Sequence, residues 1–89
     1  MTKTNWELIG YVKRSDNRLR ALRLLQTPMM PSELGKEMKI SLTHASKIVR
    51  ELNSKKMISC LNKNLKVGRI YQITKVGKNT IEKVQQITS

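Results

Sequence analysis

The sequence predicts one small domain over residues 1–89 that is mostly α-helical with a small β-hairpin, an α+β fold class. Its 89 residues suffice for one hydrophobic core but not for two. Apolar residues recur at helical spacing in most segments, whereas two short segments after residue 56 are typical of strands joined by a turn. The expected order is four helices, the hairpin and a closing helix.

Two helices are expected in the N-terminal part. Residues 4–13 form the first, because Thr4 and Glu7 have the spacing of a capping box ahead of an apolar face. Ser15 is expected to cap a second helix that ends near Gln26. The apolar positions of this second helix are Leu19, Leu22 and Leu25, and Arg14, Arg18, Arg20 and Arg23 lie in it or just before it.

Residues 31–54 are predicted to form two helices with a short connection. Pro31 begins the first of them, since proline favours the first helical position. Ser41 is placed to cap the second, over residues 42–54. Gly35 leaves room for the two backbones to approach closely, so the segment has the pattern of a helix-turn-helix.

The hairpin is expected over residues 57–74, because the strand-like stretches MISCL and RIYQIT enclose a polar, basic segment that ends in glycine. Within it, Cys60 is expected to be a small buried residue and Tyr71 to pack inward. Thr74 is expected to cap a final helix over residues 75–87. The apolar stripe of that helix comprises Val76, Thr80, Ile81, Val84 and Ile87.

The charge of the chain limits its partners. Lys plus Arg number 18 against 6 Asp plus Glu, a formal net charge of +12. This balance favours a polyanion, with nucleic acid first and an acidic membrane surface second. A merely basic protein is the alternative, although self-repulsion of this size destabilises a small fold unless something neutralises it. No acidic residue lies between Leu52 and Ile81, a stretch that contains Lys55, Lys56, Lys63, Lys66, Arg69, Lys75 and Lys78.

The helix over residues 42–54 has one apolar and one polar side. The apolar side comprises Leu42, Ala45, Ile48, Val49 and Leu52, and the polar side centres on Thr43, Ser46, Lys47 and Arg50. Taken singly, these polar residues are best interpreted as solvated. As a set, they lie where the second helix of a helix-turn-helix enters the major groove of DNA, and their groups can bond to bases or phosphates. His44 is either a further contact of this kind or simply exposed.

The tip of the hairpin adds basic candidates for DNA contact. Lys63, Asn64, Lys66 and Arg69 are expected to reach the adjacent minor groove or the phosphates. The alternative is that their charges protect the strand edges from pairing with other chains.

Two stretches, PSELGKEMKISLTHASKIVRELNSKKMI and GRIYQIT, resemble the winged helix-turn-helix transcriptional regulators of archaea and bacteria, of the MarR and ArsR kind. The resemblance covers residues 15 to about 87. It implies a three-helix core, a two-stranded wing and a closing helix. It also implies that Thr43, His44, Ser46, Lys47 and Arg50 belong to the recognition helix and that residues 62–69 form the wing. The chain departs from this family at Met30, which stands where a capping Ser or Thr is usual. It also has no Cys/His cluster like that of ArsR-type sensors, so no metal, cofactor or small-molecule effector is expected.

The helices expected at both ends of the chain carry apolar faces. Together, these faces exceed the apolar surface that one small core is expected to bury. We therefore expect a homodimer, since a two-fold protein matches a two-fold DNA site. The alternative is that the two end helices pack on each other within one chain. The expected interface comprises Trp6, Ile9, Val12, Ile81, Val84 and Ile87.

Other functions find little support. The 6 carboxylates include no pair near His44 or Cys60, and no phosphate-binding glycine loop is present, so no catalytic residues are expected. Neither a spanning apolar run nor a signal peptide is evident, which favours a cytoplasmic, nucleoid-associated protein without a membrane partner. The expected function is sequence-specific binding of double-stranded DNA by a homodimeric transcriptional regulator. The alternatives are an interaction adaptor in a larger complex and a nonspecific nucleic-acid or chromatin-associated protein.

Overall fold

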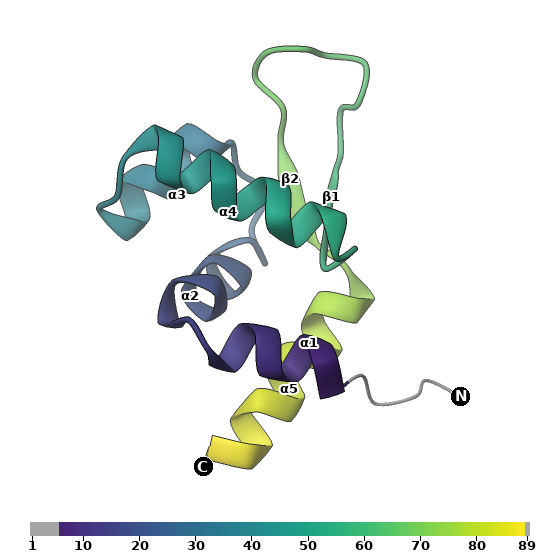
Figure 1. Cartoon of the computed structure of the whole chain (residues 1–89). Coiled ribbons are helices and arrows are strands. Elements are labelled where there is room, and N and C mark those ends of the chain that lie inside the picture. The colour runs from purple at the N-terminus through teal and green to yellow at the C-terminus, as the bar shows by residue number, and fades with distance from the viewer. Residues whose placement is uncertain (1–5, 89) are drawn as a thin grey trace.

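A computed structural model describes residues 6–88 of the chain, with side chains through residue 86 (Figure 1). The predicted fold class is confirmed, because the structure contains helices and one two-stranded antiparallel sheet in the expected order. The elements are α1 (Trp6–Lys13), α2 (Asp16–Leu24), α3 (Pro31–Met38), α4 (Leu42–Ser54), β1 (Ile58–Cys60), β2 (Tyr71–Ile73) and α5 (Lys75–Thr88).

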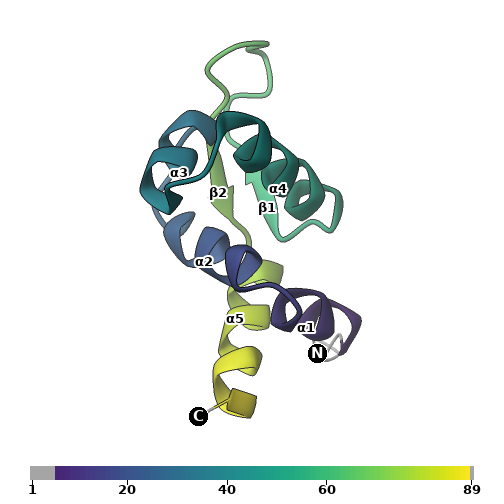
Figure 2. The same cartoon turned by 60° about the vertical axis from the view of Figure 1, so that its left-hand side comes forward.

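The helices surround α2. Figures 1 and 2 show α3, α4 and the hairpin at one end of the molecule, α1 and α5 at the other, and α2 between them. Helix α2 contacts α1, α3, α4 and α5. The core is aliphatic, as the absence of Phe requires, and its largest fully buried side chains include Leu22, Leu25, Leu34, Leu52 and Met57.

The terminal helices bury each other's apolar faces within the chain. Ile9 and Val12 of α1 and Ile81 and Val84 of α5 are all buried in the single core. The expectation that one core could not accommodate both faces is therefore wrong for these four residues. The physical reason is that α1 packs directly on α5 while both also contact α2. Of the expected interface residues with described side chains, only Trp6 is exposed, at 68%; the side chain of Ile87 lies outside the described part.

Side-chain caps fix the starts of α4 and α5 as predicted. The N–H of His44 donates to Ser41 Oγ at 3.1 Å. At α5, the N–H of Gly77 donates to Thr74 Oγ1 at 3.2 Å, and the same hydroxyl donates to the Lys56 carbonyl at 2.7 Å. Thr74 therefore joins the start of α5 to the segment that precedes β1.

The other helix starts differ in how they are capped. Ser15 is the N-cap of α2, as predicted, but its side chain makes no capping hydrogen bond, and α2 ends at Leu24, before Gln26. Met30 precedes α3 without a capping hydroxyl, and its N–H instead donates to the Glu33 carboxylate at 2.9 Å. The predicted cap Thr4 lies outside the described residues.

The hairpin is joined to the segment before α3. Its register pairs Ile58 with Ile73 and Cys60 with Tyr71. On its other side, β2 forms an isolated antiparallel bridge in which Tyr71 exchanges two backbone hydrogen bonds with Met29, at 2.9 and 3.1 Å. This bridge fixes the position of the hairpin relative to the start of α3.

Helices α3 and α4 approach each other closely at Gly35, as predicted. A Cβ at this position would lie 3.3 Å from the Cβ of Ala45 and 3.3 Å from the carbonyl oxygen of Ile40. The connection turns at Lys39, whose φ of 60° lies in the left-handed region. The helix-turn-helix geometry thus follows from a small residue at the crossing point and a left-handed residue at the end of α3.

Candidate nucleic-acid interface

Helix α4 presents most of its polar residues to solvent. Thr43, His44, Lys47 and Arg50 are exposed and Ser46 is half buried. The apolar side, comprising Ala45, Ile48, Val49 and Leu52, is buried against the core. Leu42 differs from its predicted place, because it begins the helix beyond the edge of the core and is exposed.

The loop between β1 and β2 projects from the body of the domain near α4 (Figures 1 and 2). All four predicted contact residues of this loop, Lys63, Asn64, Lys66 and Arg69, are exposed. Lys63 and Asn64 are the central residues of a turn closed by a hydrogen bond from the Leu65 N–H to the Asn62 carbonyl at 3.0 Å, whereas Lys66 and Arg69 lie on the side that leads back to β2. The loop and its two strands are called the wing below.

Asn62 holds the two sides of the wing together. Its Nδ2 donates to the Gly68 carbonyl at 3.1 Å, and its Oδ1 accepts from the N–H of Ile70 at 2.8 Å. A further bond crosses the loop, from Arg69 Nε to the Leu65 carbonyl at 2.6 Å. Gly68 has a φ of +73°, which glycine adopts without strain. The resemblance implied that Asn62 begins the wing, but nothing in the sequence indicated this bridging role, because its partners lie six and eight residues away.

Replacing Asn62 with Ala should loosen the wing without unfolding the domain. A net hydrogen bond contributes about 0.5–1.5 kcal/mol, so the amide of Ile70 is expected to exchange with solvent about three to ten times faster. Asn64→Ala is the matched control, because Asn64 is exposed on the same loop. Hydrogen exchange followed by NMR measures both variants. Equal exchange rates for Ile70 in the two variants would contradict the bridging role of Asn62.

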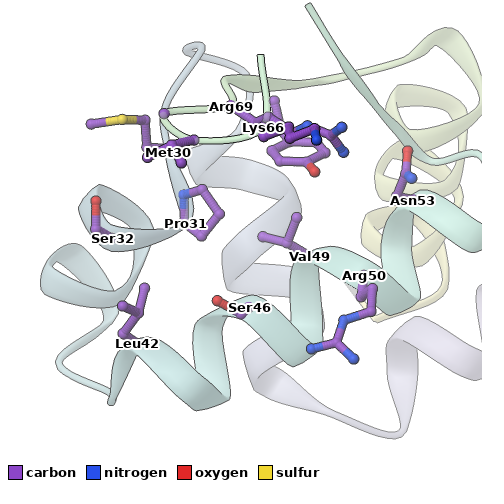
Figure 3. A pocket seen from close by; sticks show the side chains of 13 residues that line it. Met30, Pro31, Ser32, Leu42, Ser46, Val49, Arg50, Asn53, Lys66 and Arg69 are labelled. Atoms are coloured by element: carbon purple, nitrogen blue, oxygen red, sulfur yellow. The ribbon is translucent and has the colours of Figure 1, made fainter. Parts of the chain in front are cut away.

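A groove of about 570 Å³ separates α4 from the wing. Its lining includes Met30 and Pro31 at the start of α3, Ser46, Val49 and Arg50 of α4, Lys66 and Arg69 of the wing, and Tyr71 of β2. Figure 3 shows Lys66 and Arg69 across from Ser46 and Arg50, with Val49 between the two sides. The structure thus brings four of the predicted contact residues around one groove. Thr43, His44, Lys47, Lys63 and Asn64 are exposed but do not line it.

An aromatic ring of α1 lies beside a cation of α2 and beside the residue that follows α4. The Tyr11 ring lies 3.7 Å from the Arg18 guanidinium carbon and 5.1 Å from Lys55 Nζ. Arg18 also donates to the Tyr11 carbonyl at 2.7 Å. Burial raises the pKa of the Tyr11 phenol, the Arg18 cation opposes this shift, and the Glu51 carboxylate adds to it. Glu51, the only carboxylate of α4, therefore acts on Tyr11 and does not line the groove.

Cys60 is the one cysteine of the sequence. Cys60 was predicted to be buried, but it is only half buried, because it is the last residue of β1, where the hairpin leaves the core. Its thiol donates to Asn62 Oδ1 at 3.4 Å. Within the described residues, no three His, Cys, Asp or Glu side chains gather as metal ligands would. None of the described helices has the length and apolar character needed to cross a membrane.

Comparison with known proteins identifies the fold. No family model and no curated protein sequence matches the chain. Among solved structures, a MarR variant from E. coli in complex with operator DNA superposes with a TM-score of 0.76 over 93% of this chain, at 22% identity. The chain has the MarR winged-helix fold. It spans 61% of that E. coli chain.

Two further structures agree with this assignment. A second structure of the multiple antibiotic resistance repressor MarR gives a TM-score of 0.70 at 23% identity, over 90% of this chain and 62% of that one. A MarR family transcriptional regulator from Silicibacter pomeroyi gives 0.68 at 14% identity, over 91% and 61%. The predicted winged helix-turn-helix and its MarR-like character are confirmed at the level of fold. The ArsR-like part of the resemblance stays a prediction.

Proposed function

We propose that this winged-helix chain binds double-stranded DNA sequence-specifically and regulates transcription as a homodimer. The observation that carries the proposal is that the exposed polar face of α4 and the cationic wing frame one groove. Thr43, Ser46, Lys47 and Arg50 would meet base edges in a major groove, with His44 beside them, and residues 62–69 would meet the adjacent minor groove or its phosphates. The similar fold of a MarR variant that was solved on operator DNA supports this arrangement.

The groove between α4 and the wing could receive one sugar–phosphate strand of the duplex. One sugar–phosphate strand separates a major groove from the neighbouring minor groove, so this strand would lie between a helix in the first and a loop in the second. Lys66 and Arg69 line the groove from the side of the wing, so each could bond to that strand. Arg50 lines it from the opposite side, on the helix that would enter the major groove. Cationic contacts to phosphates release counterions and supply affinity that depends on salt but carries no sequence information.

The homodimer is proposed to form at the end made by α1 and α5, away from the wing (Figure 1). Because Ile9, Val12, Ile81 and Val84 are buried in the core, the contact would rely on other parts of these helices. Trp6 is the exposed member of the predicted set, and large aromatic residues are enriched where proteins associate. The proposed function requires no catalytic group or cofactor. It implies a cytoplasmic protein that is bound to the DNA of the nucleoid.

The direct test is selection from a library of random duplexes. The purified chain is incubated with the library near physiological salt in the presence of excess competitor DNA, and bound duplexes are sequenced. An enriched inverted repeat, with half-sites about 34–36 Å apart, is the expected result. A single enriched motif without a repeat would contradict the homodimer alone. No enrichment, with binding that disappears as salt rises, would contradict sequence-specific recognition and favour an adaptor or a nonspecific DNA-binding protein.

Replacing Lys66 with Ala should weaken binding to all duplexes alike. Lys66 lines the groove and is proposed to neutralise a phosphate, so the slope of log affinity against log salt should fall by about 0.9. Arg20→Ala is the control with the same charge change, because Arg20 is exposed on α2 and does not line the groove. Fluorescence anisotropy titrations at several salt concentrations measure both. An unchanged slope for Lys66→Ala would remove Lys66 from the phosphate contacts.

A further inference from the structure

The wing exposes apolar side chains as well as cations. Val67 is 86% exposed, Leu61 53% and Leu65 49%. Single exposed apolar residues are ordinary on protein surfaces, but here three fall within seven residues of one loop. They are interleaved with Lys63, Lys66 and Arg69, so the tip alternates apolar and cationic groups.

The exposure of these residues is built into the loop. The bonds of Asn62 to Gly68 and Ile70 close the base of the loop, and Arg69 Nε holds the Leu65 carbonyl at 2.6 Å. Leu65 and Val67 are therefore held on the outer part of the wing, away from the core. Val67 also belongs to the lining of the groove that faces α4. Such a surface is presented before any partner arrives.

The charge around these residues indicates what kind of partner covers them. No acidic residue lies between Leu52 and Ile81, so the surface suits a partner that is itself strongly anionic. The minor groove of DNA offers both an apolar and an anionic surface, since its walls are formed by deoxyribose carbons and its edges by phosphates. It is only about 6 Å wide, which admits a thin loop but not a helix. Proteins that enter the minor groove commonly place apolar side chains against its floor or between its base steps.

We propose that Leu65 and Val67 form an apolar contact with the minor-groove walls of duplex DNA, while Lys66 and Arg69 hold the phosphates beside them. This inference rests on the proposed DNA binding and assigns a second, chemically different role to the wing. Burying apolar surface removes water without releasing counterions, so this part of the affinity does not depend on salt. It also favours flexible pyrimidine–purine steps under the wing, because a groove must widen to admit side chains.

The experiment compares Leu65→Ser, Val67→Ser and the double variant with the unmodified protein. Val76→Ser is the matched control, because Val76 is a 38% exposed valine in the first turn of α5, next to β2 and outside the predicted set of dimer-interface residues. The probe is a duplex that the unmodified protein selects, titrated by fluorescence anisotropy from about 50 to 200 mM salt, the range over which phosphate contacts change affinity most visibly. Thermal unfolding of each variant is measured in parallel and is expected to be unchanged, since the replaced side chains are exposed.

The double variant is expected to bind about tenfold more weakly at every salt concentration, with an unchanged salt slope. Val76→Ser is expected to bind like the unmodified protein, and Val67→Ile to retain full affinity. Unchanged affinity of the double variant would overturn the inference and leave the apolar tip to a protein partner. A flattened salt slope would also overturn it, because the loss would then come from phosphate contacts. If the unmodified protein selects no duplex, the proposed function fails first, so the two failures are distinguishable.

Discussion

Replacing Arg50 with Ala is expected to weaken binding to the preferred duplex by about 1–3 kcal/mol, or about five- to 150-fold, and to relax base preference at one position. Arg50 is exposed on α4 and lines the groove opposite the wing. An arginine in a major groove can bond to two acceptors of one guanine, a pattern that no other base offers. Its loss therefore removes both an attraction and a discrimination.

The measurement is a set of dissociation constants for the preferred duplex, for each single-base change within it and for a random duplex. Arg20→Ala supplies the control, because Arg20 is exposed on α2 and does not line the groove. It removes the same charge from the protein. A loss for Arg50→Ala that is equal on preferred and random DNA would restrict Arg50 to phosphate contact and contradict its proposed role in base selection.

Replacing Gly77 with Ala is expected to destabilise the domain by about 1–3 kcal/mol, the usual cost of overpacking. Helix propensity alone favours the opposite sign, since Ala exceeds Gly by about 1 kcal/mol in a helix. The structure explains the reversal. A Cβ on Gly77 would collide with the carbonyl oxygen of Met57 and lie 2.6 Å from Ile73 Cγ1. The Met57 carbonyl cannot move freely, because it accepts the N–H of Thr74 at 2.9 Å.

Gly10→Ala is the matched control for Gly77→Ala. Gly10 lies within α1, and a Cβ there would meet nothing within 4 Å. This variant is expected to stabilise the domain by about 0.5–1 kcal/mol, because only the propensity term operates. Urea unfolding followed by circular dichroism gives both free energies. If the free energies of unfolding of the two variants change in the same direction, packing against Met57 and Ile73 is not what requires glycine at position 77.

Local signals made the helix-turn-helix predictable. Pro31 and Ser41 act within one helical turn of their own positions, and Gly35 acts at the nearest crossing, so the sequence nearby contains the relevant information. The polar face of α4 was predictable for the same reason. The groove was not, because the position of the wing beside α4 depends on the pairing of Met29 with Tyr71, which are distant in the chain.

The errors arose where packing depends on size and not on polarity. The apolar stripe predicted for α5 included Val76, which is exposed, and omitted Gly77, which is buried. Thr80, a predicted member of the stripe, is buried as expected. Glycine at position 77 lets α5 approach Met57 and Ile73 closely, and hydrophobic periodicity does not register this. The apolar faces of α1 and α5 were likewise expected to remain partly exposed in a single chain, whereas most of them are buried in its core. The exposure of Leu65 and Val67 is not predictable from the sequence pattern, because the pattern does not distinguish an outward apolar residue from an inward one.

The exposure of Trp6 has a spectroscopic consequence. It is the only tryptophan of the chain, and the core contains no phenylalanine, so indole emission comes from one site on α1. Tyr71, by contrast, lines the groove between α4 and the wing. Indole fluorescence therefore reports on the end where self-association is proposed, and it is insensitive to the packing of the aliphatic core. Association and DNA binding can be followed separately in the unlabelled protein, the first through Trp6 and the second through an anisotropy signal carried by the duplex.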